Sequence, residues 1–443
     1  MPPPNPFLEP PIPAGHGTVH LSLLPPSLPT LSTLSYRYPL KLLTRTPAVN
    51  LASTSKFPET ASTPVHLYIL TYGGGLLPGD HIAVDIKVCR RARMVIATPQ
   101  GSQKIYKTEG QKRQLLEGDG KGDDEGEGEG ELDDTDREDG EEEEKELGGK
   151  DDTERSTQSL SVHLEPFSAL CYLPDPTVPY SDSQYEQVQR FYMHQTSGNP
   201  SSSSSSHEPG SEPSLCMLDW VTQGRSARGE DWSFRSWRGK NEIISLSPED
   251  LSPSTSMTSN PFSLSQTKTK PEEGKKKTGK RKGRLLLRDN IILEADPPTS
   301  NLKGGDRELT RPLSIRHQVH SHGIIGTLTL YGPVFEDLAE FFMGEYRSLP
   351  RIGGRNWNAH SSSSTTSSVR PGGTAAAEEE EKLRRRKKLS ENVTWTAARV
   401  RDKFVLIKFG AKDFESAREW LGEMVRREGS IEREFGEEGY GCL

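Results

Sequence analysis

Long apolar runs are missing from this chain of 443 residues. No stretch approaches the about 18 consecutive apolar residues that a membrane-spanning helix needs, so we expect no membrane span and no membrane partner. The first residues, MPPPNPFLEPPIPAGHG, lack a basic start and an apolar core, so we expect no secretory signal. Apolar residues make up only 31% of the chain. That share is too small to order every residue in one uniform globule.

Cysteine is also scarce. The four cysteines, Cys89, Cys171, Cys216 and Cys442, form no CxxC pair, so neither a disulfide framework nor a structural zinc site is expected. This usage indicates a reducing, cytoplasmic setting. The basic run at 275–284 could be a nuclear-localisation signal or a nucleic-acid patch. Because it lacks interleaved aromatic residues, we favour a solvated loop and expect no nucleic-acid partner.

The negative charge of the chain is concentrated in one segment. The net charge is −8, but residues 117–154 hold 21 Asp or Glu against 4 Lys or Arg, so the remainder carries +9. Like charges repel and glycine has no side chain to bury, so this segment is expected to be disordered. With four other polar stretches it makes a set of predicted insertions in a single domain that follows a Pro-rich N-terminal tail: 110–157, 197–214, 251–284, 297–310 and 356–391.

The remaining segments are typical of strands. Apolar residues alternate with polar ones in 82–88, and the period of two predicts a half-buried strand. Helical spacing occurs late in the chain, in 334–343 and 414–425. The prediction is an all-β fold with two short C-terminal helices. The other predicted strands are 66–72, 93–98, 159–164, 215–221, 242–246, 285–293, 323–331 and 403–409.

The most conspicuous motif is the glycine-rich loop of residues 72–80. Gly73, Gly74, Gly75 and Gly79 could cradle a phosphate, but only if a helix followed them. A strand pattern follows instead. We therefore favour a tight turn that needs positive φ at glycine, with Asp80 accepting hydrogen bonds from nearby backbone amides.

Two further segments carry polar side chains in extended patterns. Gln100, Ser102, Lys104 and Tyr106 would share one face of an extended chain and could line a wet channel, although a solvated outer face explains them as well. The prolines of 173–180, which surround Asp175, predict a shaped loop that continues to Gln187.

Charged and histidine-rich motifs complete the set of candidates. Gly224 and Arg225 precede Glu230, and the two charges could form a structural ion pair across a turn. His317, His320 and His322 could bind Ni, Cu or Zn, with His320 and His322 on one face if the segment is a strand. The alternative is a surface strand that happens to carry histidines.

Five motifs in a fixed order resemble one family. They read GGGLLPGD, TPQGSQKIY, LPDPTVPY with a following SQYEQ, LDWVTQGRSARGEDWSF, and LLLRD, which contains Asp289. This succession is similar to the urease accessory protein UreD, called UreH in some organisms, in a eukaryotic form with large insertions. The sequence departs from the family pattern at Pro99 and Gly101.

The resemblance implies a fold and a non-enzymatic role. UreD proteins are described as a coiled two-layer β-superhelix that binds urease apoprotein and UreF, which recruits the GTPase UreG. Nickel is then carried transiently, with no permanent cofactor, through an internal passage to the urease active site. By motif match, Gly73, Gly74, Gly75, Gly79, Asp80, Gly224 and Arg225 would be architectural. The candidates for passage lining or partner contact are Gln100, Lys104, Tyr106, Asp175, Gln187, Glu230 and Asp289.

Two alternative functions stay open at this point. One is a metallochaperone that stores nickel at His317, His320 and His322, which predicts tight nickel binding. The other is an enzyme that binds a nucleotide at the Gly73–Gly79 loop.

Overall fold

The structure is a computed structural model of the whole chain, and it describes eight stretches of residues. These stretches are 12–46, 55–98, 103–107, 155–196, 211–251, 283–294, 314–349 and 391–443. Apart from a few residues at their ends, the five predicted insertions lie outside the described residues. Of the described helices, none is long and apolar enough to cross a membrane.

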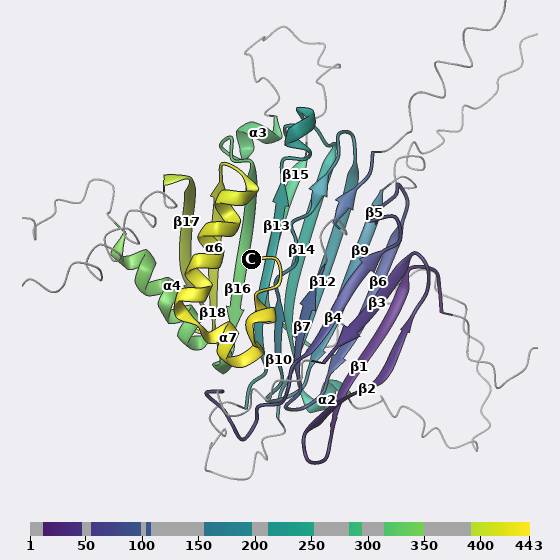
Figure 1. The fold of residues 1–443 in the computed structure, drawn as a ribbon, viewed down its shortest axis with the longest axis vertical. Helices are drawn as coiled ribbons and strands as arrows, with labels where there is room; N and C mark the ends of the chain where they lie inside the picture. Colours follow the sequence, from purple (N-terminus) through teal and green to yellow (C-terminus); the bar gives the residue numbers. More distant parts are fainter. Residues whose placement is uncertain are drawn as a thin grey trace, which may run out of the picture.

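Two large β-sheets make up most of the fold (Figure 1). The seven-stranded sheet has the order β15-β14-β12-β9-β6-β1-β2, and the eight-stranded sheet has the order β17-β18-β16-β13-β10-β7-β4-β3. The first comprises β1 (His16–Leu24), β2 (Leu28–Tyr36), β6 (His81–Val88), β9 (Ser156–Leu164), β12 (Gln184–His194), β14 (Ser236–Leu246) and β15 (Arg284–Glu294). The second comprises β3 (Leu40–Arg45), β4 (Val65–Thr71), β7 (Arg93–Ala97), β10 (Ala169–Tyr172), β13 (Ser214–Thr222), β16 (Ile324–Tyr331), β17 (Val393–Val400) and β18 (Phe404–Ala411).

A third, small sheet consists of β5 (Gly75–Leu76), β8 (Lys104–Ile105) and β11 (Val178–Pro179) in the order β11-β8-β5. The helical elements are short and lie mostly in the second half of the chain. They are η3 (Ser226–Arg228), α2 (Pro248–Leu251), α3 (Ile315–Gln318), η4 (Pro333–Phe335), α4 (Glu336–Ser348), α6 (Phe414–Glu428), α7 (Ser430–Phe435) and η6 (Glu437–Tyr440).

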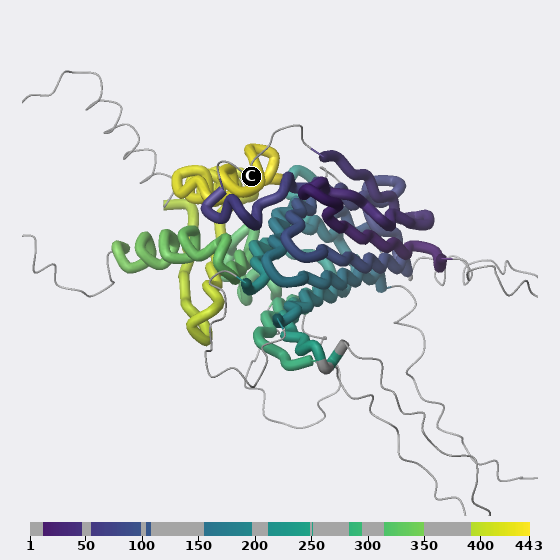
Figure 2. Tube along the Cα trace, turned by 90° about the horizontal axis from the view of Figure 1, so that it is seen from below, coloured from purple at the N-terminus to yellow at the C-terminus, as the bar shows by residue number. Residues whose placement is uncertain are grey.

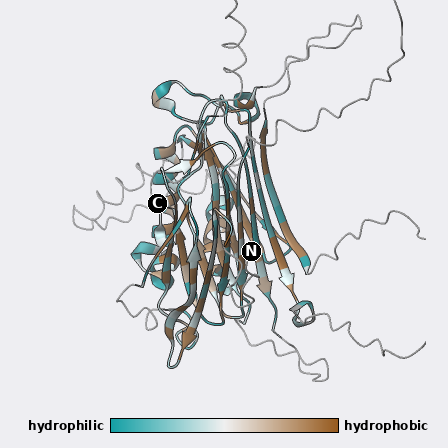
Figure 3. Cartoon of the chain, turned by 90° about the vertical axis from the view of Figure 1, so that its right-hand side faces the viewer, coloured by the Kyte–Doolittle hydropathy of each residue, from teal (hydrophilic) through white to brown (hydrophobic). Residues whose placement is uncertain are grey.

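From β4 to β14, successive strands of the two large sheets alternate between them. β6, β9, β12 and β14 are parallel neighbours in one sheet, while β4, β7, β10 and β13 are parallel neighbours in the other. Each passage of the chain therefore adds one strand to each layer. Figure 3 shows the two layers edge-on, and Figure 2 shows the N-terminal strands and the C-terminal helices at opposite ends of the fold.

Period-two sequences bury one face of each strand between the sheets. β9, STQSLSVHL, is buried at every second residue. Its inward residues Leu160 and Val162 belong to the same apolar core as Met217 and Val221 of the opposite sheet. β13 is buried at all nine positions, because its outer face is covered as well.

The C-terminal helices cover the outer face of the eight-stranded sheet (Figure 1), and a second apolar core lies between these helices and the sheet. Asp413 begins α6 by accepting the Ser416 N–H at 2.8 Å, and Gly429 ends it in the left-handed conformation. The apolar stripe of α6 brings Trp420 against Trp395 and Phe409, with ring centroids 5.4 and 5.5 Å apart.

The all-β prediction with two C-terminal helices is confirmed in its coarse form. All nine predicted strands and both predicted helices, α4 and α6, are present. Five strands of the large sheets were not predicted: β1, β2 and β3, in the region after the proline-rich start, and also β10 and β17. The loop predicted to continue to Gln187 ends earlier, so its predicted end was wrong: strand β12 begins at Gln184. β12 escaped detection because its inward positions include Gln187 and Gln189, which hide the apolar alternation.

Candidate functional site: a polar layer between the sheets

The glycine-rich loop is a turn between strands, as predicted. Gly73, Gly74 and Gly79 have φ values of 85°, 75° and 79°, which favour glycine. The Asp80 carboxylate accepts the Leu77 N–H at 2.8 Å. Strand β6 follows the loop, so the helix N-terminus that the nucleotide interpretation required is replaced by a strand.

Lys104 and Tyr106 lie against this turn rather than in a row along the core. β5 and β8 pair Gly75 with Lys104, and a Cβ on Gly75 would lie 2.5 Å from the Lys104 carbonyl oxygen. The Tyr106 hydroxyl donates to the Gly73 carbonyl at 3.2 Å. Gln100 and Ser102, the other two members of the predicted polar row, lie outside the described residues.

Asp175 lies close in space to the C-terminal residues of the chain. Its backbone N–H donates to Thr98 Oγ1 at 2.9 Å, and Cys442 Sγ lies 2.9 Å from the neighbouring Pro174 carbonyl oxygen. Burial raises the pKa of Asp175 to about 6, against the opposing charge of Arg418. Pro174 and Asp175 therefore lie where the proline-rich segment meets the C-terminal residues.

Arg225 and Glu230 form the predicted ion pair. The Arg225 backbone N–H and Nε each donate to the Glu230 carboxylate at 2.9 Å. The guanidinium lies 3.7 Å from the centre of the Tyr180 ring. Gly224, at φ 110°, lets Glu230 approach, since an added Cβ would lie 3.2 Å from Glu230 Oε2. The pair locks the loop after β13.

Polar side chains from several strands meet inside the sandwich, within a mainly apolar interior. Asp219 of β13 is only 3% exposed. Its carboxylate accepts hydrogen bonds from Gln187 Nε2 of β12 at 3.2 Å and from Asn241 Nδ2 of β14 at 2.7 Å. The Tyr185 hydroxyl lies within hydrogen-bond distance of two amide oxygens, Gln187 Oε1 at 3.1 Å and Gln158 Oε1 at 3.2 Å. These hydrogen bonds connect the two sheets through their facing surfaces.

Asp289 extends this group toward one edge of the fold. It pairs in register with Asn241 across β14 and β15, so the two side chains share a face. Its carboxylate forms an ion pair of 2.6 Å with Lys408 of β18. Lys408 pairs across the strands with Thr327 of β16, and Thr327 in turn pairs with Asp219 of β13. We call this set the polar layer: Gln158, Tyr185, Gln187, Asp219, Asn241, Asp289, Thr327 and Lys408.

Several polar atoms in and beside the polar layer have no hydrogen-bond partner among the described residues. They include Asp289 Oδ2, Asn241 Oδ1, Gln189 Oε1 and Thr329 Oγ1. Buried polar atoms are normally satisfied by protein, water or an ion. Burial and the charge of Asp289 raise the pKa of Asp219 to about 6, although hydrogen bonds from Asn241 and Gln187 oppose the shift. The polar layer can therefore hold water or a weakly bound cation.

Sequence reasoning selected Gln187 and Asp289 but missed Asp219, Asn241 and Lys408. A signal for Asp219 was available, because it is a single acid within the apolar run LCMLDWV. Gly239 was not singled out either. It pairs with Gln187 of β12 and precedes Asn241 by two residues on β14, so it lies on the same inward face. An added Cβ would lie 3.2 Å from Asp219 Oδ2.

The histidine motif does not lie on a strand, so the prediction that His320 and His322 share one face of a strand was wrong. His317 belongs to the short helix α3, and His320 and His322 follow in a turn, where His320 has φ 53°. His317 Nδ1 contacts Ser314 Oγ at 2.7 Å. In the part of the chain that the structure describes, no group of three His, Cys, Asp or Glu residues is placed to hold a metal ion. This placement argues against nickel storage at the three histidines.

Comparison with known proteins shows which family the chain belongs to. The family model described as the UreD urease accessory protein matches residues 15–438. This chain belongs to the UreD family. A protein of Schizosaccharomyces pombe named "Uncharacterized urease accessory protein ureD-like" is 27% identical over 87% of this chain and 84% of its own length.

Relatives in other fungi and in plants match a shorter part of the sequence. Urease accessory protein 4 of Cryptococcus neoformans is 30% identical over 52% of this chain, and urease accessory protein D of Arabidopsis thaliana is 25% identical over 48%. These matches cover 56% and 50% of the two relatives. Membership of the UreD family supports a role in urease maturation.

Proposed function

We propose that this chain is a non-enzymatic scaffold that binds urease apoprotein together with UreF-type and UreG-type partners, and that it conducts Ni²⁺ to the urease active site. The alternation of strands between two parallel layers supports the coiled two-layer superhelix that this role implies. The observation that carries the proposal is the polar layer. It places two buried carboxylates, those of Asp219 and Asp289, inside a mainly apolar sandwich.

The chemistry of the polar layer suits passage rather than storage. Its groups that could bind a cation are carboxylate, amide and hydroxyl oxygens, which hold Ni²⁺ less tightly than thiolates or imidazoles do. Lys408 compensates the charge of Asp289, which leaves Asp219 as the carboxylate whose charge has no cation in contact among the described residues. A dication entering the layer would gain from Asp219 without meeting a closed ligand set.

The test uses urease in cells that lack the native chain. Complementation with wild-type protein is compared with Asp219→Asn and Asp289→Asn. Asp402→Asn is the control, since Asp402 lies in an exposed turn at φ 57°, where asparagine is well tolerated. We expect both interior variants to lower urease activity and the nickel content of purified urease, while urease still copurifies with the chain.

Two results would contradict the proposal. One is fully nickel-loaded urease with both interior variants. The other is a loss of complex formation that parallels the loss of nickel, because the polar layer would then be structural only.

A further inference from the structure

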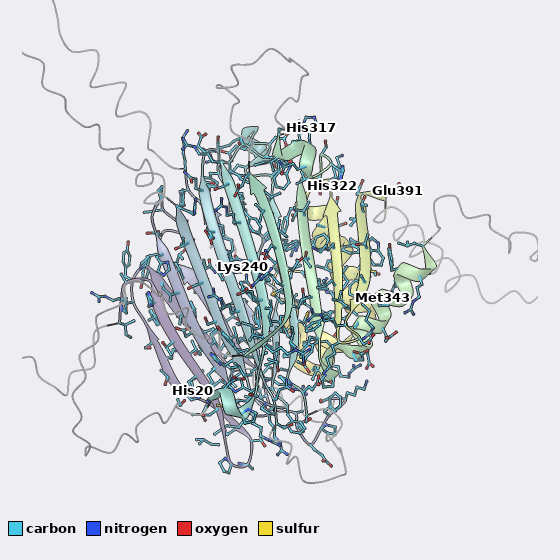
Figure 4. All side chains as sticks on the ribbon, turned by 180° about the vertical axis from the view of Figure 1, so that it is seen from behind. His20, Lys240, His317, His322, Met343 and Glu391 are labelled. Atoms are coloured by element: carbon cyan, nitrogen blue, oxygen red, sulfur yellow. The ribbon has the colours of Figure 1, made fainter. Side chains whose placement is uncertain are left out.

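A second group of titratable side chains lies on the outer face of the seven-stranded sheet, away from the polar layer. Register places His20, Lys87, His163 and Tyr192 in one row across β1, β6, β9 and β12. Their sequence neighbours, such as Leu21, Val88, Val162 and Met193, belong to the core between the sheets. The row therefore faces outward. His20, near one end of the molecule, lies far from His317 (Figure 4).

Two imidazoles of this face are in direct contact. His163 Nδ1 lies 3.0 Å from His194 Nε2, and the ring planes are inclined by 75°. Tyr192 stacks on His163 with centroids 4.5 Å apart and planes within 13°. His194 is only 8% exposed. Packing thus holds both rings in place while their nitrogens face one another.

That spacing equals the separation of two neighbouring ligands on one metal ion. Imidazole nitrogens bind a divalent transition metal at about 2.1 Å, so two at right angles lie about 3.0 Å apart. We propose that His163 Nδ1 and His194 Nε2 form a binding site for a divalent transition-metal ion of the Ni²⁺ and Zn²⁺ class. The proton between the two nitrogens moves through solvent to the outer nitrogen of the ring that carries it, so both imidazoles stay neutral and no net proton is released.

The surroundings favour this use of the pair. Burial lowers the pKa of both histidines, because desolvation disfavours the charged imidazolium form. The charged groups around them are Lys87, Glu165 and Asp85, and the Lys87 charge is compensated by Glu165 at 2.9 Å. Since no third His, Cys, Asp or Glu completes the site among the described residues, water fills the remaining positions and the ion can exchange readily.

A second close pair on the same face provides the matched control. His20 Nε2 lies 3.2 Å from Cys89 Sγ, but burial raises the pKa of that thiol, so it stays protonated and is a poor ligand. His20→Gln therefore removes a histidine from the same sheet face without touching the proposed site. The inference is independent of the nickel passage, because it involves neither Asp219 nor Asp289.

The experiment titrates the full chain, without a histidine tag, with NiCl₂ by calorimetry at pH 7.5. We expect His163→Gln and His194→Gln each to remove one bound ion per chain, or to weaken it at least 10-fold, and the double variant to remove no more than either single one. His20→Gln should bind as the wild type does. Unchanged binding in either single variant, or an equal loss with His20→Gln, would overturn the proposal.

A footprint on the wild-type chain avoids any doubt about folding of the variants. Diethyl pyrocarbonate modifies accessible imidazoles, and the sites are read by mass spectrometry. Ni²⁺ should protect His163, which is more exposed than His194, while modification of His20 is unchanged. Equal modification with and without Ni²⁺ would show that the 3.0 Å contact is a hydrogen bond only.

Discussion

Arg93 of β7 and Glu434 of α7, 341 residues apart, form an ion pair in which the side chains are 2% and 0% exposed. Ser55 Oγ and the Lys56 N–H also donate to the Glu434 carboxylate, at 2.6 and 2.7 Å. The pair ties α7 to an inner strand of the eight-stranded sheet. It holds the C-terminal segment against the strand layers that contain the polar layer.

Removing one partner of this pair should destabilise the whole fold. Glu434→Gln leaves Arg93 buried without a counter-charge, and we expect a loss of about 3–5 kcal/mol in the free energy of unfolding. Chemical denaturation measures it. Asp231→Asn is the control, because it removes an acid from the exposed ion pair with Arg316 and should cost at most about 1 kcal/mol. Equal effects of the two changes would disprove a structural role for the buried pair.

The charge of Asp219 should make stability depend on pH. Its pKa rises from an ordinary value of 3.8 to about 6 in the folded chain, so the folded state binds this proton more tightly than the unfolded state does. The ionised form therefore costs stability, by up to about 3 kcal/mol, as pH rises from about 4 to above 6. Relative to wild type, Asp219→Asn should gain stability over that range.

Denaturation curves at several pH values between 4.5 and 7.5 test this expectation. The slope of the difference between variant and wild type is the readout, since a constant offset reflects altered hydrogen bonds to Gln187 and Asn241. A flat difference for Asp219→Asn would mean that its carboxyl titrates normally.

Two glycines of one turn should respond differently to the same substitution. Gly73 has φ 85° but no atom within 4 Å of an added Cβ, so Gly73→Ala should cost about 1 kcal/mol of backbone strain. Gly75→Ala would place its Cβ 2.5 Å from the Lys104 carbonyl and 2.7 Å from the Tyr106 ring. We expect a larger loss of unfolding free energy and a separation of β5 from β8. A larger loss for Gly73→Ala would contradict this assignment.

The loop after β13 should loosen in acid. Burial raises the pKa of Glu230, but hydrogen bonds from Arg225 outweigh it, so the pKa lies below its ordinary value. A carboxylate of this kind stabilises the fold above its ordinary pKa of 4.5 and loses that contribution as pH falls further. Fluorescence of the buried Trp232 should report the opening. Glu230→Gln should cost about 1–2 kcal/mol and remove the pH dependence, and an unchanged acid transition would refute it.

Local patterns in the sequence determined much of this protein. Alternating residues in 82–88 and 159–164 predicted β6 and β9, since a strand with one buried face must repeat every second residue. The turn at Gly73 and Asp80 followed from backbone sterics and short-range hydrogen bonding, and the ordered motifs indicated the UreD family. These features depend on neighbours within a few residues, so no tertiary information was needed.

The tertiary structure alone decided how distant segments meet. Gln187, Asp219, Asn241 and Asp289 come from four strands, and their convergence depends on strand order and register, which a single sequence does not show. The same holds for His163 and His194, which lie on separate parallel strands. Period-two reasoning even obscured β12, because inward glutamines break the apolar pattern that identifies a strand. A polar interior is visible only when the opposite sheet is in place, since burial is a property of the assembled layers.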